Sequence, residues 1–430
     1  MASKRALLIV IGATLVAACD GVVPNPGTTF TSATAAELRA RIRVECGACD
    51  WQKAGSEAVV LAITLDDRAP IHLPVTRSGT AEYELLLGTV APGRHTVSIA
   101  PDQTLSATSL RGADAATFSV DVDHIAATSP THRALSLAPF VYARADTVGK
   151  FTDVPLLMWY EVEPTSLGTR YRYSVIFSNE DGGTPADRLM ATWGRTTDIE
   201  YLYSVEIDAD GKILSEDMQG PKHEVLPFKG TREGTHPLLW VSTENNMVLD
   251  TGTTTVRYAP TPVLVNLDKV SREVVMDANP WTYEVMAKEL AREGKIVADA
   301  PPGKGAIPDL RRFVFIEGCG EAGTSAIAAS VNVGGAWYSS DRSVVEYRIV
   351  RDGCFRAAIP LPGSATARDV QAVRFEAHPR KDRAAGISRI TRLNRVFSLD
   401  ERFVPGPSVV QWEGVASLKA GGPPLEIPVR

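Results

Sequence analysis

The polar residues of this sequence that could carry out chemistry gather in its middle third, in short runs between strand-like segments. The runs cover 178–184, 193–200, 223–224, 235–237 and 243–246. Each falls at an expected strand end or turn, and loops on a rigid sheet are where binding and catalytic side chains usually lie. Two kinds of chemistry fit these residue types, namely metal-assisted or carboxylate-based hydrolysis and the binding of a ligand without catalysis.

The first interpretation is an extracytoplasmic hydrolase. Its candidate metal ligands are two carboxylates and two histidines, Asp198, Glu200, His223 and His236. Two histidines with one carboxylate leave a coordination position open for water, and Glu224 or Glu244 would act as the general base. No second histidine follows Glu224 at the spacing of a His-Glu-x-x-His helix, so these residues form a set of candidates and not a motif. A carboxylate pair, Glu180 or Asp181 with Glu200, could instead serve a glycosidase.

The second interpretation is a binding module. The same region carries aromatic side chains that could offer flat faces to a sugar: Trp159, Tyr160, Tyr171, Tyr173, Trp193, Tyr201, Tyr203 and Trp240. Asn179, Asp181, Trp193 and Arg195 are the candidate binding residues. A structural interpretation competes with both, because aromatic residues of strands commonly build the core and Asn-Glu-Asp-Gly-Gly at 179–183 is favourable turn chemistry.

The N-terminus indicates export. Lys4 and Arg5 precede an uncharged stretch, 6–18, that is shorter than the roughly 20 apolar residues of a membrane helix. A positive start, a short apolar core and a small-residue end are typical of a secretory signal peptide. Here the small residues lead directly into a cysteine, Val-Ala-Ala-Cys at 16–19. This order resembles the lipobox of bacterial lipoproteins; the alternative is an ordinary signal peptide that has a cysteine near its cleavage site.

The lipobox resemblance implies that residues 1–18 are removed and that Cys19 becomes the acylated first residue of the mature chain. The first expected partner is therefore a lipid bilayer outside the cytoplasm. Asp20 is similar to the inner-membrane retention signal of enterobacterial lipoproteins, but other bacteria do not follow that rule reliably. The choice between the inner and the outer membrane stays open.

Export also explains the other four cysteines, since disulfides persist in oxidising compartments. We expect one disulfide between Cys46 and Cys49 and a second between Cys319 and Cys354. The Cys-Gly-Ala-Cys spacing of the first pair is shared with redox motifs and with half a zinc site. It lacks a second pair and a thioredoxin-like context, which favours a structural disulfide.

Composition and patterning predict a mainly β chain of several domains. The 45 basic and 51 acidic residues give a net charge of −6, which argues against a general nucleic-acid binder. Short stretches that alternate with period two between turn signals are typical of sandwiches of the immunoglobulin-like or jelly-roll type. The hairpin at 83–97 resembles the penultimate hairpin of immunoglobulin-like modules on secreted bacterial proteins. One short helix is expected near 281–292, between Pro280 and Gly294.

The expected organisation is a signal peptide at 1–18, a flexible tether at 19–35, an immunoglobulin-like domain at 36–140, a central β domain at 141–298 and a C-terminal sandwich at 308–430. The leading functional hypothesis is a membrane-anchored protein of the cell envelope that binds a polysaccharide, another polymer or an envelope protein without catalysis. The alternative is the hydrolase described above, with its site in the central domain. The sequence identifies no cofactor.

Overall fold

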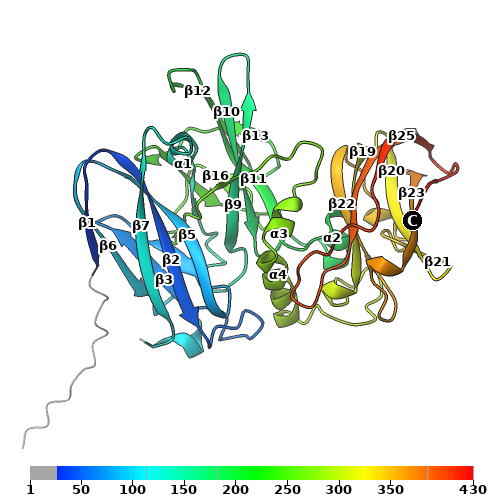
Figure 1. Cartoon of the computed structure of the whole chain (residues 1–430), viewed down its shortest axis with the longest axis horizontal. Helices are drawn as coiled ribbons and strands as arrows, with labels where there is room; N and C mark the ends of the chain where they lie inside the picture. Colours follow the sequence, from blue (N-terminus) through cyan, green and yellow to red (C-terminus); the bar gives the residue numbers. More distant parts are fainter. Residues whose placement is uncertain (1–26, 113, 181, 385, 430) are drawn as a thin grey trace, which may run out of the picture.

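The computed structural model describes residues 27–112, 114–180, 182–384 and 386–429. The signal-peptide segment, Cys19 and Asp181 lie outside these residues. Figure 1 shows three groups of strands side by side, and the chain passes from the first (blue) through the central group (green) to the C-terminal group (yellow to red). The prediction of a mainly β chain built from several sandwiches is confirmed.

The first domain is a sandwich of two antiparallel sheets, ordered β1-β6-β3-β4 and β5-β2-β7. Its strands are β1 (Thr28–Ser32), β2 (Ala36–Cys46), β3 (Val60–Leu65), β4 (Ile71–Pro74), β5 (Gly79–Val90), β6 (Gly93–Pro101) and β7 (Thr117–Ala126), with one short 3-10 turn, η1 (Thr108–Leu110). In β2, buried Ile42 and Val44 alternate with exposed Arg41 and Arg43, which is the period of a strand with one face in the core.

The predicted tether at 19–35 is wrong over β1. Residues 28–32, Thr-Thr-Phe-Thr-Ser, pair with β6 from Thr28 opposite Val97 to Ser32 opposite Gly93. Threonine and phenylalanine favour strands, and β6 offers this segment a free edge. The prediction of a flexible tether therefore does not hold for residues 28–32.

The central domain has one large sheet, ordered β13-β12-β11-β10-β9-β18, and one small sheet, ordered β14-β15-β8-β17 with β16 beside β15. The large sheet contains β9 (Pro155–Pro164), β10 (Thr169–Phe177), β11 (Asp198–Ile207), β12 (Ile213–Gln219), β13 (Val225–Pro227) and β18 (Val263–Leu264). The small sheet contains β8 (Phe140–Tyr142), β14 (Arg232–Glu233), β15 (His236–Val241), β16 (Val248–Leu249) and β17 (Arg257–Tyr258).

Four helices accompany these sheets, namely α1 (His132–Ser136), α2 (Ala186–Trp193), α3 (Val274–Ala278) and α4 (Trp281–Arg292). Helix α4 confirms the helix predicted near 281–292. Helix α2 was not predicted. It starts after Pro185 and ends at Gly194, whose left-handed backbone (φ 64°) and N–H bond to the Met190 carbonyl form a typical glycine C-cap.

The C-terminal domain is a second sandwich, with sheets ordered β22-β19-β24-β25 and β21-β20-β23-β26. Its strands are β19 (Phe313–Glu321), β20 (Ser325–Val333), β21 (Ala336–Ser339), β22 (Gly353–Pro360), β23 (Val370–Pro379), β24 (Ile387–Phe397), β25 (Trp412–Lys419) and β26 (Leu425–Pro428). Three short 3-10 turns join them, η2 (Leu310–Arg312), η3 (Val345–Tyr347) and η4 (Ala367–Asp369).

Both predicted disulfides are present. Cys46–Cys49 closes the end of β2, and Cys319–Cys354 joins residues that lie directly opposite each other in β19 and β22. Two disulfides are typical of a chain that folds in an oxidising compartment outside the cytoplasm. Among the described residues, no helix has the length and apolar character needed to cross a membrane.

Hydrophobic cores join the domains to one another. The inner face of the large central sheet, with Tyr173 and Val205, shares one core with residues of the first domain such as Leu86. Part of the outer face, with Trp159 and Ile176, packs in another core with α4 and with Phe315 of the C-terminal domain. The large sheet is therefore covered on one face by the first domain and on part of the other by helices and the C-terminal sandwich.

A polar clamp ties α4 to the first domain. Trp51, fully buried in the loop after the Cys46–Cys49 disulfide, donates its indole N–H to Glu289 of α4 (2.9 Å). Arg292, one turn further along α4, donates to the carbonyl oxygens of Trp51 (3.0 Å) and Phe151 (2.6 Å), and its guanidinium lies over the Trp51 ring. Burial raises the pKa of Glu289 from 4.5 to about 7, against the opposing effects of Arg292 and the Trp51 hydrogen bond.

This clamp makes stability depend on pH in a defined direction. The folded chain holds a proton on Glu289 up to about pH 7, whereas the unfolded chain loses it near pH 4.5. Below pH 4.5 this group makes its full contribution to the free energy of unfolding. Between pH 4.5 and about 7 that contribution falls by about 3 kcal/mol in total, and above pH 7 it changes no further.

We expect urea unfolding at pH 5, 6, 7 and 8 to show this fall in the native chain. Glu289→Gln, which still offers an oxygen to Trp51, should flatten the pH dependence over that range. Identical pH profiles for the two chains would contradict the assignment.

Candidate functional site

The structure uses His236 to join two domains. Its side chain is fully buried, with Nδ1 2.9 Å from the Ala138 carbonyl oxygen and Nε2 3.2 Å from a carboxylate oxygen of Glu37 in the first domain. Its ring stacks on Phe140 at a centroid distance of 4.5 Å. A histidine with both nitrogens engaged inside an interface is a structural residue.

Of the remaining candidates, His223, Glu200 and Asp198 lie near one another, since the His223 charge pulls down the pKa of Glu200 and the Glu200 charge raises that of Asp198. His223 is exposed in the turn between β12 and β13, 3.1 Å from the Gln219 side chain, and Glu224 accepts the backbone N–H of Lys222 (2.6 Å). Glu244 is exposed in the turn before β16. In the part of the chain that the structure describes, no group of three or more His, Cys, Asp or Glu side chains is placed to hold a metal ion. The predicted ligand set does not form, because His236 belongs to the interface.

Asp198 is buried at the start of β11. It accepts a hydrogen bond from the Asn246 amide (3.0 Å) and lies 4.0 Å from Arg195. Burial raises its pKa well above the ordinary value, and the neighbouring carboxylates Glu200 and Glu180 act in the same direction. A carboxyl group with 3% of its side chain exposed is suited to holding loops together and not to reaching a ligand.

The predicted binding residues Asn179 and Arg195 lie close to Asp198 and Asn246. Asn179 is buried and donates to Glu293 (3.2 Å), and its carbonyl oxygen lies 3.4 Å from the Asn246 amide. Arg195 is buried and paired with Glu273 (3.2 Å), and its guanidinium lies 5.4 Å from the centroid of the partly exposed Trp193 ring. Asn179 and Arg195 therefore serve as buried structural partners, and of the described candidate binding residues only Trp193 is partly exposed.

A groove on the outer face of the large sheet is the strongest candidate site. It measures about 590 Å³ and is lined by Glu161, Arg170, Arg172, Ser174, Tyr201, Ser204, Asp217, Val225, Leu267 and Arg272. Strand register explains the lining. Glu161 of β9 lies opposite Arg172 of β10, Arg172 opposite Ser204 of β11, and Ser204 opposite Asp217 of β12, which makes one row of polar side chains across four strands.

A β-bulge brings an aromatic ring to this groove. Tyr173 of β10 pairs with Tyr203 of β11, but the register shifts at the next residue, so that Ser174 pairs with Tyr201. Tyr203 points into the core and is fully buried, whereas Tyr201 lines the groove and is partly exposed, with the Arg172 guanidinium 5.8 Å from its ring centroid. A regular strand would place both tyrosines on one face.

The groove mixes both signs of charge. Burial raises the pKa of Glu161, while Arg172 and Arg272 pull it down. Burial likewise raises the pKa of Asp217, against Arg170 and Arg172. The groove thus offers carboxyl groups and guanidinium groups as well as a serine pair and a phenol, which suits a ligand with many hydroxyl groups, because each hydroxyl both donates and accepts.

Another large cleft, of about 830 Å³, lies between the first domain and the central sheet. Its charged residues are satisfied by one another, since Arg39 pairs with Asp123 (2.8 Å) and Glu84 (3.1 Å), and Arg41 also pairs with Asp123 (3.1 Å). These ion pairs all lie within the β5-β2-β7 sheet of the first domain, so the named charges already have partners of their own.

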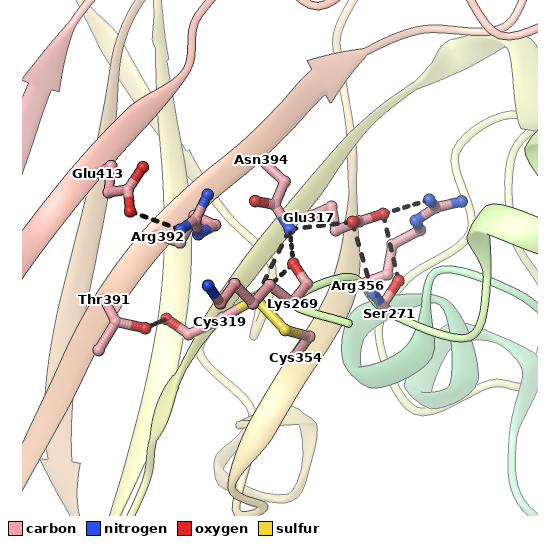
Figure 2. Close-up of a disulfide and its surroundings, with 10 residues drawn as sticks. All are labelled: Lys269, Ser271, Glu317, Cys319, Cys354, Arg356, Thr391, Arg392, Asn394 and Glu413. Carbon is pink, nitrogen blue, oxygen red and sulfur yellow. Dashed lines mark hydrogen bonds and ion pairs between the residues drawn. A yellow bond between two sulfur atoms is a disulfide. The ribbon is translucent and has the colours of Figure 1, made fainter. Parts of the chain in front are cut away.

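The end of the groove is held by a buried network with the C-terminal domain. Arg356 of β22 donates to Glu317 of β19 (2.6 Å), and Glu317 in turn accepts from the Ser271 hydroxyl (3.2 Å), as Figure 2 shows. Arg356 also donates to the carbonyl oxygen of Glu273 (3.2 Å). Both neighbours of Arg272 are thereby fixed, and Arg272 itself is left to line the groove.

Figure 2 also shows how the preceding turn is secured. Asn394 of β24 donates to the Lys269 carbonyl oxygen (2.8 Å) and to Glu317 (3.1 Å), beside the Cys319–Cys354 disulfide. The disulfide holds β19 to β22, the strands that carry Glu317 and Arg356. The C-terminal sandwich thus acts as a support for one wall of the central groove.

Sequence reasoning missed most of the residues that line the groove, including Glu161, Arg170, Arg172, Asp217 and Arg272. One signal was available. In β10, Arg170 and Arg172 alternate with Tyr171 and Tyr173, so the face opposite the tyrosines had to be charged. Only the tyrosine face of this strand was predicted to bind a ligand, and the arginine face was not.

Comparison with known proteins adds no family. A scan against protein-family models finds no match, and a search of curated proteins finds none either. Among solved structures, the chain described as "NLPPya in complex with mannosamine" is similar at 12% identity, over 32% of this chain and 73% of that chain, with a TM-score of 0.23. A TM-score this low supports no argument about fold or ligand, so the function has to be argued from the site itself.

We expect Arg356→Met to lower the free energy of unfolding by about 3–5 kcal/mol, because it leaves Glu317 and Asp277 without their buried partner. Chemical denaturation at pH 7 measures the loss. Arg389→Met removes an exposed pair with Glu321, 3.3 Å long, and should cost less than about 1 kcal/mol. Equal, small losses in the two variants would contradict the role given to Arg356.

Proposed function

We propose that this chain is a lipid-anchored protein outside the cytoplasm whose central domain binds a carbohydrate or a related polymer without catalysis. The observation that carries the proposal is the groove on the outer face of the central sheet. A half-exposed tyrosine ring, Tyr201, lies there beside a row of hydrogen-bonding side chains that crosses four strands. Mostly pre-formed concavities with a few convergent polar groups are the usual ligand sites of proteins.

The spacing of the groove carboxylates favours binding over hydrolysis. Glu161 and Asp217 lie on β9 and β12, three strand spacings apart in one row, which separates their backbones by about 14 Å. Paired glycosidase carboxylates lie about 5–9.5 Å apart. Asp198 is buried, and Glu200 is not among the residues that line the groove.

The anchor rests on the lipobox resemblance at Cys19. Strand β1 begins at Thr28, so the eight residues 20–27 separate the proposed lipidated cysteine from the first domain, a reach of at most about 30 Å. Such a tether would hold the first domain next to the bilayer and leave the central groove to face a ligand in the envelope.

Cys19→Ala tests the anchor. We expect the native chain to incorporate radiolabelled palmitate and to sediment with membranes, and the variant to lose both properties. Cys46→Ala, which removes a cysteine that the structure holds in a disulfide, serves as the control and should keep the label. Labelling that persists in Cys19→Ala would contradict the anchor and leave the groove proposal standing.

Tyr201→Ala tests the groove. In a glycan array followed by titration calorimetry, we expect the best ligand to bind about tenfold more weakly to this variant, because an aromatic contact is worth about 1 kcal/mol or more. Tyr338→Ala, which removes a partly exposed ring from β21 of the C-terminal domain, should bind as the native chain does. Unchanged affinity in Tyr201→Ala would contradict the groove as the site.

A further inference from the structure

Three guanidinium groups surround a single indole ring at the end of the groove. Arg351, Arg195 and Arg272 lie 3.5, 5.4 and 5.6 Å from the centroid of the Trp193 ring. They come from three separate segments, which precede β22, follow α2 and precede α3. We call these four residues the Trp193 cluster. Such a gathering of like charges is costly unless something compensates it.

The compensation within the described residues is incomplete. Glu273 is fully buried and pairs with Arg195 at 3.2 Å. Arg351 donates to the carbonyl oxygen of Thr192 (2.6 Å), a neutral acceptor. No carboxylate of the described residues lies within 4.0 Å of the guanidinium nitrogens of Arg272 or Arg351.

The positive charge of the three arginines shifts the pKa values of neighbouring groups. Burial alone would raise the pKa of Glu273, but Arg195, Arg356, Arg272 and Arg351 together hold it below its ordinary value. Burial lowers the pKa of Arg351 to about 9, with Arg195 and Arg272 acting in the same direction against Glu273. Glu200 and Glu161 also face Arg272, which acts against the rise that burial causes in the pKa of both carboxyl groups.

The Trp193 cluster is continuous with the groove. Arg272 lines the groove and also contacts the Trp193 ring, and Trp193, Arg272 and Arg351 are each partly exposed. The planar fork of a guanidinium binds two oxygens of a carboxylate or a sulfate at once, and desolvated guanidinium groups bind such groups more strongly than exposed ones do.

We propose that the groove binds an acidic glycan, with a carboxylate or sulfate group of one sugar held by Arg272 and Arg351 beside Trp193 while neighbouring sugars lie along the polar row and Tyr201. This proposal rests on the glycan-binding function proposed above and adds the chemical class of the ligand. The sign of the charge follows from the arginines without carboxylate partners, and the polymeric form follows from the polar row that crosses four strands beyond them.

Titration calorimetry of the full chain in detergent tests the proposal with three hexasaccharides, namely oligogalacturonate, a sulfated heparin fragment and neutral maltohexaose. We expect at least one acidic hexasaccharide to bind about tenfold or more tightly than the neutral one in 50 mM salt, and to lose most of that advantage in 500 mM salt, where charges are screened beyond about 4 Å. Preference for oligogalacturonate would identify a carboxylate, and preference for the heparin fragment a sulfate.

Two variants assign the effect to the cluster. Arg272→Gln, which alters a partly exposed side chain, should weaken acidic binding about tenfold and leave neutral binding unchanged, and Arg351→Gln should act in the same way. Arg389→Gln, an exposed arginine of β24, is the matched control and should change neither affinity. Melting temperatures close to that of the native chain establish that each variant is folded.

The outcomes separate the two proposals. Equal affinity for acidic and neutral glycans, with Tyr201→Ala weakening both, would overturn the acidic specificity and keep the groove function. Acidic binding that Arg272→Gln leaves intact would place the anion elsewhere and overturn the inference. Absence of binding to all three hexasaccharides would overturn both the inference and the glycan-binding function on which it rests.

Discussion

The arrangement of this molecule depends on one buried guanidinium. Arg356 is fully enclosed between the C-terminal sandwich and the central domain, where Asp277, Glu317 and the Tyr283 hydroxyl surround it at 2.6–2.8 Å. A buried charge of this kind is stable only in one geometry, because moving any partner leaves an uncompensated ion. Gly194 shows how closely the chain fits, since a Cβ there would lie 2.7 Å from the Arg356 side chain. The turn after α2, and with it Trp193, is thereby fixed in place.

Domain packing divides the central sheet into three surfaces, and Arg356 fixes the part of that packing that involves the C-terminal domain. Its inner face is closed by the first domain, and α4 is clamped to that domain through Trp51. Part of its outer face is closed by α4 and the C-terminal sandwich, which Arg356 holds in register. The part of the outer face that remains uncovered is the groove. Arg272 forms its end, and the neighbouring residues Ser271 and Glu273 are held by the Arg356 network. The proposed site is thus a product of domain packing as much as of the sheet itself.

Sequence reasoning was reliable where a single local rule decides the outcome. Helix α4 lies between Pro280 and Gly294, and the cysteines pair as export predicts. Sequence reasoning failed where contacts between residues far apart in the chain determine a side chain's role. His236 looked like a ligand because nothing local shows that Glu37 lies beside it. Tyr201 reaches the groove only because of a bulge whose register depends on the neighbouring strand. Helix α2 could have been predicted from local signals, because Pro185 precedes its first residue and Gly194 follows its last.

The most direct test of this account is amide hydrogen exchange of the full chain with and without a saturating acidic hexasaccharide. The account predicts slower exchange in 265–273 and in β10 to β12, the segments that form the groove and its arginine end. Slower exchange confined to 123–131 and 261–264, which line the cleft between the first domain and the central sheet, would contradict it.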